Sequence, residues 1–300
     1  MSRPLPRISL VIPSYNQGAY IGETLESIAQ QQYPELELFV FDGGSKDNTV
    51  DVIRQYEHLI TYWESVPDRG QSHAINKGFE RATGYLFNWL NSDDLLEAGA
   101  LFHLAELVEK NPQASLFCGS TRIFNTQGTQ RYSGPVVFTH AEITLGYGQV
   151  NQPSMYYRRE VWEPDDFCNE SLHMCMDLDL WMRYLIAHGQ ENIVQTDFHL
   201  TAFRLHELSK TLSQGEKGFR REIDALYTAL YSSVKNYTGI QRERIVKSEN
   251  YYWLWRADEL MLKRAWTEAK RSLKKANFFQ LDATARRRYL GVYRRLMLKK

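Results

Sequence analysis

Short apolar runs and amphipathic stretches alternate along the first 110 residues of the chain. The apolar runs predict β-strands at residues 8–12, 36–41, 60–63 and 85–90. Stretches whose apolar residues recur every three or four positions predict helices at residues 19–32, 49–56, 72–82 and 98–110. We expect Pro13 to end the first strand, because proline has no N–H to donate to a neighbouring strand.

This alternation is typical of an α/β fold with a mostly parallel sheet flanked by helices. Residues 115–160 are β-rich and less regular, and residues 177–188 predict another helix. From residue 216 onward the pattern is helical to the end. We therefore predict two domains, an α/β domain at residues 1–215 and a helical region at residues 216–300.

The composition favours a protein of the cytosol. The 300 residues are 43% apolar, which is enough for one large domain or for a domain with an appendage. No apolar stretch is long enough to span a membrane, and the first residues lack the apolar region of a signal peptide. Three scattered cysteines are too few for a disulfide framework, so we expect reduced thiols.

The charge is divided unevenly along the chain although the net charge is zero. Residues 241–300 carry 17 lysines and arginines against 6 aspartates and glutamates, a net charge of +11. The preceding 240 residues therefore carry a net charge of −11. Such a split indicates separate roles for the two parts.

Four polar loops follow the four predicted strands. In a parallel sheet the carboxyl ends of neighbouring strands meet at one edge, so we expect these loops to lie together. The last loop contains paired carboxylates, which suit Mg²⁺ or Mn²⁺ and, through the metal, a diphosphate. Alone, this loop would equally suit a turn followed by a helix cap. The loops are Pro13-Ser14-Tyr15-Asn16, Asp42-Gly43-Gly44-Ser45-Lys46-Asp47, Asp68-Arg69-Gly70-Gln71 and Asn91-Ser92-Asp93-Asp94.

Two other classes of nucleotide-binding enzyme are disfavoured. The loops contain no G-x-G-x-x-G, the pattern of dinucleotide-binding dehydrogenases. A nucleotidyltransferase would need a glycine-rich first loop bearing lysine or arginine, and the loop that follows residue 12 is not of this kind.

Together with two further segments, these loops resemble the motifs of family-2 glycosyltransferases of the GT-A fold. The further segments are Ala74-Ile75-Asn76-Lys77-Gly78 and Asp177-Leu178-Asp179-Leu180-Trp181, and the resemblance covers roughly residues 7–210. It implies an inverting transfer of a sugar from a nucleoside diphosphate, most simply UDP, with Mn²⁺ or Mg²⁺. The implied acceptor is a saccharide or a lipid-linked saccharide in surface-glycan synthesis.

The resemblance also implies roles for individual residues of the donor site. Asp42 would accept a hydrogen bond from the imide of uracil, and one metal ligand would be Asp94, with Asp93 and His206 as further candidates. Asn91 departs from the family pattern, which has an aspartate there, and this weakens the case for a metal. The residues expected around the nucleotide are Pro13, Ser14, Tyr15, Asn16, Asp42, Asp68, Gly70, Gln71, Lys77, Ser92 and Asp93.

The expected catalytic base is Asp177, with Asp179 as the second candidate. Inverting transfer needs a base that removes the proton of the acceptor hydroxyl as that oxygen attacks the anomeric carbon. Two residues apart on a helix, the two carboxylates point in different directions, so only one can face the site. Their position in the first turn of a helix would also explain both as partners of the helix dipole.

The basic region at residues 241–300 has two open interpretations. Alanines at positions 257, 269 and 276 resemble the spacing of a tetratricopeptide-like helix pair, which would have to pack on something else. The last helix alternates arginines with large apolar residues, which suits either an anionic membrane surface or the acidic body of the chain. We consider nucleic acid a weaker partner, since no recognition motif is present. The expected location is cytoplasmic, peripheral on the inner face of the plasma membrane in the first interpretation.

A second function remains open at this stage. The chain could be a non-catalytic scaffold that keeps a nucleotide pocket and acts through its basic helical tail. The joint presence of Asp93, Asp94 and Asp177 argues against it.

Overall fold

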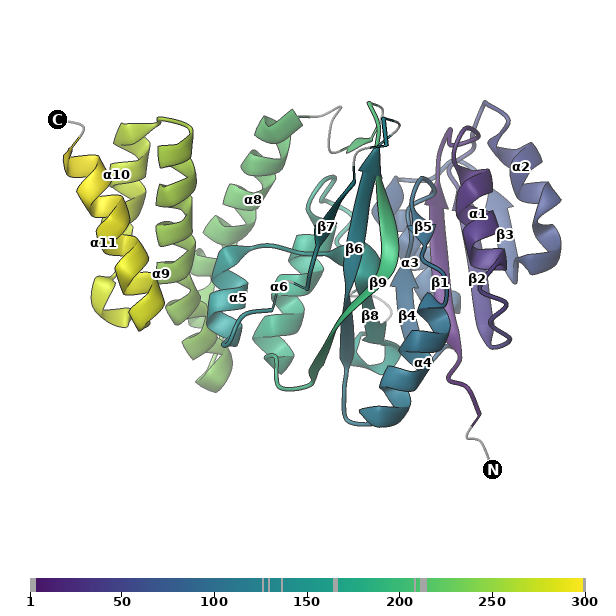
Figure 1. The fold of residues 1–300 in the computed structure, drawn as a ribbon, viewed down its shortest axis with the longest axis horizontal. Helices are drawn as coiled ribbons and strands as arrows, with labels where there is room; N and C mark the ends of the chain where they lie inside the picture. The colour runs from purple at the N-terminus through teal and green to yellow at the C-terminus, as the bar shows by residue number, and fades with distance from the viewer. Residues whose placement is uncertain are drawn as a thin grey trace. The chain divides into compact units, whose positions relative to one another are not determined.

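A computed structural model describes residues 4–125, 127–128, 130–135, 137–163, 167–207, 209–210 and 215–298. It divides into two compact units (Figure 1). Unit 1 comprises Met1–Pro135, Asn151–Leu180 and Asn192–Arg220, and unit 2 comprises Val136–Val150, Trp181–Glu191 and Arg221–Lys300. The division therefore does not follow a single cut at residue 215, because two earlier segments belong with the last 80 residues.

Unit 1 contains one mixed sheet, whose first four strands are parallel. These strands lie in the order β3 (Tyr62–Ser65), β2 (Leu36–Asp42), β1 (Ile8–Ser14) and β4 (Leu86–Trp89). All four predicted strands are thus present. The prediction that Pro13 ends the first strand is wrong, because β1 continues to Ser14. The ladder with β4 ends at Val11 and Trp89, so the N–H that Pro13 lacks has no ladder partner to lose.

The sheet continues beyond β4 with strands of mixed direction. An antiparallel neighbour, β8, joins β4 to β6, and β6 pairs in parallel with the long β9. Two short strands complete the described part of the sheet, β5 on β9 and β7 on β6. Their bounds are β5 (Leu95–Leu96), β6 (Leu116–Asn125), β7 (Gln130–Ser133), β8 (Met155–Arg158) and β9 (Ile193–Leu205).

Helices cover both faces of the parallel strands. Alternate residues of β1, such as Leu10, pack in one apolar cluster with residues of α1, α2 and α4. On the other face, Val11 lies against Gly78 of α3, where an added Cβ would be only 2.3 Å from a Val11 methyl group. The helices are α1 (Ile21–Ala29), α2 (Thr49–Gln55), α3 (Gln71–Arg81) and α4 (Ala100–Lys110).

The strand order creates a switch point at the carboxyl edge of the sheet. From β1 the chain moves to β2 and β3 on one side, and it then returns to β4 on the other side of β1. In open α/β sheets, ligands bind where the strand order reverses. The loops after β1, β2, β3 and β4 all end at this edge.

Unit 2 is helical in its described part. It contains α5 (Ala141–Tyr147), most of α6 (Met176–His188) and of α8 (Gly215–Ser232), then α9 (Gly239–Leu262), α10 (Trp266–Lys275) and α11 (Ala283–Met297). The three alanines that suggested a helix pair, Ala257, Ala269 and Ala276, are buried in one apolar cluster of these helices. None of the helices in the described ranges combines the length and apolar character that a bilayer crossing requires.

Candidate functional site

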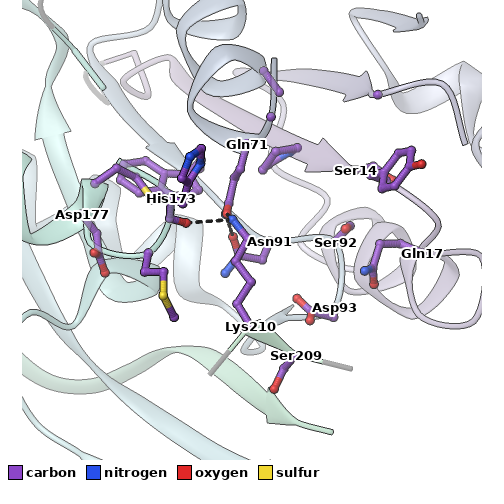
Figure 2. Close-up of a pocket in the computed structure, with 18 of the residues that line it drawn as sticks. Ser14, Gln17, Gln71, Asn91, Ser92, Asp93, His173, Asp177, Ser209 and Lys210 are labelled. Carbon is purple, nitrogen blue, oxygen red and sulfur yellow. Dashed lines mark hydrogen bonds between the residues drawn. The ribbon is translucent and has the colours of Figure 1, made fainter. Parts of the chain in front are cut away.

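A pocket of about 710 Å³ opens at the carboxyl edge of the parallel strands, within unit 1 (Figure 2). Its size is in the range of small-molecule sites. Every loop predicted to meet at this edge contributes to its wall. The lining residues are Pro13, Ser14, Tyr15, Gln17, Gly43, Pro67, Asp68, Gly70, Gln71, Ala74, Trp89, Asn91, Ser92, Asp93, Gln152, Pro153, His173, Met174, Met176, Asp177, Phe203, Ser209, Lys210 and Phe219.

One end of the pocket is formed by the loops after β1, β2 and β3. Tyr15 is 58% exposed there, so its ring is available to a flat ligand. Asp68 accepts a hydrogen bond from the backbone N–H of Gly70 at 2.8 Å. Gly70 has φ of 111°, a conformation that favours glycine, and it caps the start of α3. Gly43 allows Asp68 to approach, because an added Cβ would lie 3.2 Å from the carboxylate.

The paired carboxylates after β4 have opposite environments. Asp94 is fully buried and accepts hydrogen bonds from Asn91 Nδ2 at 3.1 Å and from the backbone N–H of Arg204 at 2.9 Å. Burial raises the pKa of the Asp94 carboxyl well above its usual range, and the Asp93 charge adds to the shift. Asp93 instead lines the pocket. This geometry reverses the expected order, in which Asp94 was the more direct metal ligand.

Asp93 and His206 provide a fitting pair of metal ligands. His206 Nε2 lies 2.8 Å from Asp93 Oδ2, close to the spacing of about 3 Å between adjacent ligands of one octahedral ion. A carboxylate with an imidazole suits Mn²⁺ better than Mg²⁺, which prefers oxygen alone. The described residues hold no cluster of three or more His, Cys, Asp or Glu side chains fit for a metal. An ion there would depend on ligand oxygens and water for its other positions.

A chain of side-chain hydrogen bonds crosses the middle of the pocket (Figure 2). Lys210 Nζ donates to Gln71 Oε1 at 2.6 Å, and Gln71 Nε2 donates to Asn91 Oδ1 at 2.7 Å. Asn91 in turn donates to Asp94. This chain explains the departure at position 91: an aspartate could not donate to Asp94 and would place like charges together. The network also holds the Lys210 ammonium group in the pocket.

Asp177 lies at the other end of the pocket, away from Ser14 and Gln17 (Figure 2). It is in the first turn of α6, and its Oδ1 accepts a hydrogen bond from the backbone N–H of Leu178 at 2.8 Å. Asp179 does not line the pocket. The geometry therefore separates the two candidate bases that spacing left open.

Several polar atoms that line the pocket are buried without a protein partner. They are Ser14 Oγ, Gln17 Oε1 and Ser209 Oγ, while Nδ1 of the neighbouring His206 is in the same state. A buried polar atom without a hydrogen bond costs about 1–3 kcal/mol, so such atoms point to a polar ligand. Gln17 was not expected in the site, and its only sequence signal is its place directly after the first loop.

Two expected nucleotide residues support the loops and do not line the pocket. Asp42 is buried and accepts hydrogen bonds from Ser45 Oγ, Ser65 Oγ and backbone N–H groups of its own loop. These donors leave its oxygens occupied, so it is not placed to read an imide. Asn16 is exposed, has φ of 52°, and accepts a hydrogen bond from the backbone of Lys46.

Lys77 is a third expected residue that lies outside the pocket. Its ammonium group pairs with Glu64 Oε1 at 2.5 Å and lies 5.0 Å from the ring centre of Phe41. The hydrogen bond from Lys77 is the main cause that lowers the pKa of Glu64. The remaining expected donor-site residues line the pocket: Pro13, Ser14, Tyr15, Asp68, Gly70, Gln71, Ser92 and Asp93.

The end of the pocket near Asp177 is more apolar. Met174, Met176, Phe203 and Phe219 line it together with Trp89, Gln152 and Pro153. The Gln152 side chain is held by hydrogen bonds to Asn88 Oδ1 at 3.0 Å and to the Trp89 carbonyl at 2.8 Å. An apolar wall beside a carboxylate suits a ligand with both C–H faces and hydroxyl groups.

Comparison with known proteins agrees with this architecture. Residues 9–176 match the sequence profile of the family described as Glycosyl transferase family 2. The poly-beta-1,6-N-acetyl-D-glucosamine synthase of Staphylococcus epidermidis is 30% identical over 120 residues, which are 39% of this chain and 29% of that protein. Matches to the first curated relatives span between 29% and 64% of those proteins.

Two solved structures share the fold at low sequence identity. TarS 1–349 of S. aureus, in complex with UDP-GlcNAc, superposes with a TM-score of 0.65 and 17% identity, covering 97% of this chain and 90% of that chain. The mannosyltransferase PcManGT of Pyrobaculum calidifontis, in complex with GDP-Man and Mn²⁺, has a TM-score of 0.59 and 19% identity, covering 90% and 75%. Both likenesses concern the fold, which is of the GT-A type.

Proposed function

Because this chain belongs to glycosyltransferase family 2, we propose that it transfers a sugar from a nucleoside diphosphate to a saccharide hydroxyl with inversion of configuration. One observation carries the proposal. A single pocket holds a carboxylate–imidazole pair, Asp93 with His206, and a separate carboxylate, Asp177, at its other end. These are the groups that a departing diphosphate and an attacking hydroxyl would each need.

The nucleotide belongs at the end of the pocket formed by the first three loops. Tyr15 offers an exposed ring for the base, and Asp68 offers a carboxylate that can accept a hydrogen bond from it. We assign this reading role to Asp68, since Asp42 is enclosed by its own loop. Ser14 and Gln17 present buried polar atoms that ribose hydroxyls would satisfy.

The diphosphate belongs in the middle of the pocket. Lys210 brings a positive charge there, and Ser209 adds a buried hydroxyl. Asp93 and His206 would hold Mn²⁺ or Mg²⁺, which when bound supplies positive charge to the leaving diphosphate. We propose metal dependence on the chemistry of this pair, and the Mn²⁺ bound in PcManGT gives independent support.

Transfer then requires one proton to leave the acceptor. Asp177 removes the hydroxyl proton while the acceptor oxygen forms its bond to the anomeric carbon. The bond from that carbon to the β-phosphate oxygen breaks on the opposite face, so the product configuration is inverted. Asp177 retains the proton until it exchanges with water, and the nucleoside diphosphate leaves through the same pocket.

UDP is the proposed nucleotide and a glycan the proposed acceptor. TarS supports UDP and PcManGT supports GDP, so the donor is an experimental question. The relation to a polysaccharide synthase supports surface-glycan synthesis, with a free or lipid-linked saccharide as acceptor. A lipid-linked acceptor would place the protein at the cytoplasmic face of a membrane.

A thermal-shift panel of UDP-, GDP- and dTDP-sugars with Mn²⁺ tests the donor site. A donor at 100 times its Kd stabilises the native state by about 2.7 kcal/mol, which raises Tm by roughly 5–10 °C. Asp68→Asn should reduce this shift, and Lys77→Gln, outside the pocket, should leave it unchanged. A panel without any shift would refute the proposal. A shift without donor hydrolysis or transfer would favour the non-catalytic scaffold.

A further inference from the structure

One side of α11 exposes arginines and large apolar side chains together. The fractional exposures are 44% for Leu290, 48% for Tyr293, 41% for Met297 and 84% for Leu298. Phe279, just before the helix, is 82% exposed. We call this surface the α11 outer face; it consists of Phe279, Arg286, Arg287, Leu290, Tyr293, Arg294, Met297 and Leu298. Positions 286, 290, 293, 294 and 297 have the helical spacing that puts them on one side.

The opposite side of α11 packs inside unit 2. Ala285 and Val292 are buried in its apolar cluster. Arg288 and Arg295 both pair with Asp258, at 2.6 and 3.0 Å. Internal packing therefore accounts for two arginines of this helix, as one interpretation of the basic tail expected.

The arginines of the outer face are not used in this way. In the part of the chain that the structure describes, Arg287 and Arg294 form no ion pair, and Arg286 donates to the carbonyl groups of Phe278 and Phe279. From residue 283 to residue 297 there is no aspartate or glutamate. The outer face is thus positively charged and partly apolar at once.

The combination decides between partners. A nucleic acid would match the arginines and leave Leu290 and Met297 facing water or phosphate. A bilayer surface with anionic lipids matches both, because arginines bind the headgroups while apolar side chains enter the acyl boundary. The helix of 15 residues, about 22 Å long, can lie flat in this layer.

We propose that the α11 outer face docks this protein on an anionic bilayer surface. The inference goes beyond the proposed transfer reaction, since it depends only on the exposure and charge of α11. Each arginine near such a surface contributes about 1 kcal/mol, or roughly fivefold in partitioning. The exposed apolar residues add a contribution that salt does not screen.

Vesicle co-sedimentation of the full chain tests the proposal. The probes are phosphatidylcholine vesicles with and without 30% phosphatidylglycerol by composition, at about 0.1 M salt. We expect binding to the anionic vesicles, and a roughly 10- to 30-fold loss in Arg287→Gln/Arg294→Gln. The matched control, Arg54→Gln/Lys110→Gln, removes two charges from side chains that are 62% and 68% exposed, and it should stay within about twofold of the native chain.

A second variant tests the apolar part of the surface. Leu290→Ser/Met297→Ser should weaken binding further at high salt, where the arginines are screened. Equal binding of the arginine variant and the native chain, or equal loss in the control pair, would overturn the proposal. Tighter binding to an oligonucleotide than to anionic vesicles would also overturn it. Donor hydrolysis should be unchanged in all variants, which separates this outcome from a failure of the proposed function.

Discussion

Replacement of Asp177 by asparagine is the sharpest test of the catalytic assignment. The change keeps the side-chain oxygen that accepts from the Leu178 N–H, so the start of α6 should be preserved. It removes the base, which in such reactions contributes about 10²- to 10⁴-fold in rate. At about 1.4 kcal/mol per factor of ten, this corresponds to about 3–5.5 kcal/mol of transition-state stabilisation.

Donor binding should hardly change in the same variant. Asp177 lies at the end of the pocket away from Ser14 and Gln17, where we place the nucleotide (Figure 2). Even at about 4 Å, two unit charges in water interact by only about 1 kcal/mol, so the donor Kd should stay within roughly fivefold. Steady-state transfer kinetics and calorimetric titration with UDP measure the two quantities separately.

Asp179→Asn is the matched control for Asp177→Asn. Both residues lie in the first turn of α6, so each replacement loses the same favourable interaction with the helix dipole, about 0.3–1 kcal/mol of stability. Only Asp177 lines the pocket. Equal loss of kcat in the two variants, or a loss below tenfold in Asp177→Asn, would refute the reasoning.

The remaining predictions concern the metal pair, packing and an ion pair. Asp93→Asn should abolish the Mn²⁺-dependent tightening of UDP in a titration and lower kcat/KM by roughly 100-fold or more; tightening that persists would contradict the assigned ligand. Gly78→Ala should destabilise the fold by about 1–2 kcal/mol in denaturant unfolding, because overpacking against Val11 outweighs the gain in helix propensity, and an unchanged midpoint would be inconsistent with the contact. Glu64→Gln should cost up to about 1 kcal/mol at pH 7, since the hydrogen bond from Lys77 lowers the pKa of Glu64. That contribution is present above the unfolded pKa of about 4.3 and is lost as pH falls through the folded value, so the two unfolding curves should converge near pH 3.

The parallel core of the fold could be predicted from local pattern. Apolar runs such as residues 36–41 are strands because both faces of the sheet are covered, and this demand is written in consecutive positions. The prediction at Pro13 failed for a non-local reason. Whether a strand can contain proline depends on where its neighbour's ladder ends, and β4 is more than 70 residues away.

The local sequence was enough to bring four loops to one sheet edge, because parallel strands of this order have no other place for their carboxyl ends. It could not say which oxygens face the ligand. Asp93 and Asp94 are adjacent, yet one lines the pocket and the other is enclosed by Asn91 and Arg204, groups separated by 113 residues. Side-chain direction at a strand end follows from such distant partners, and burial then sets which carboxylate remains available for chemistry.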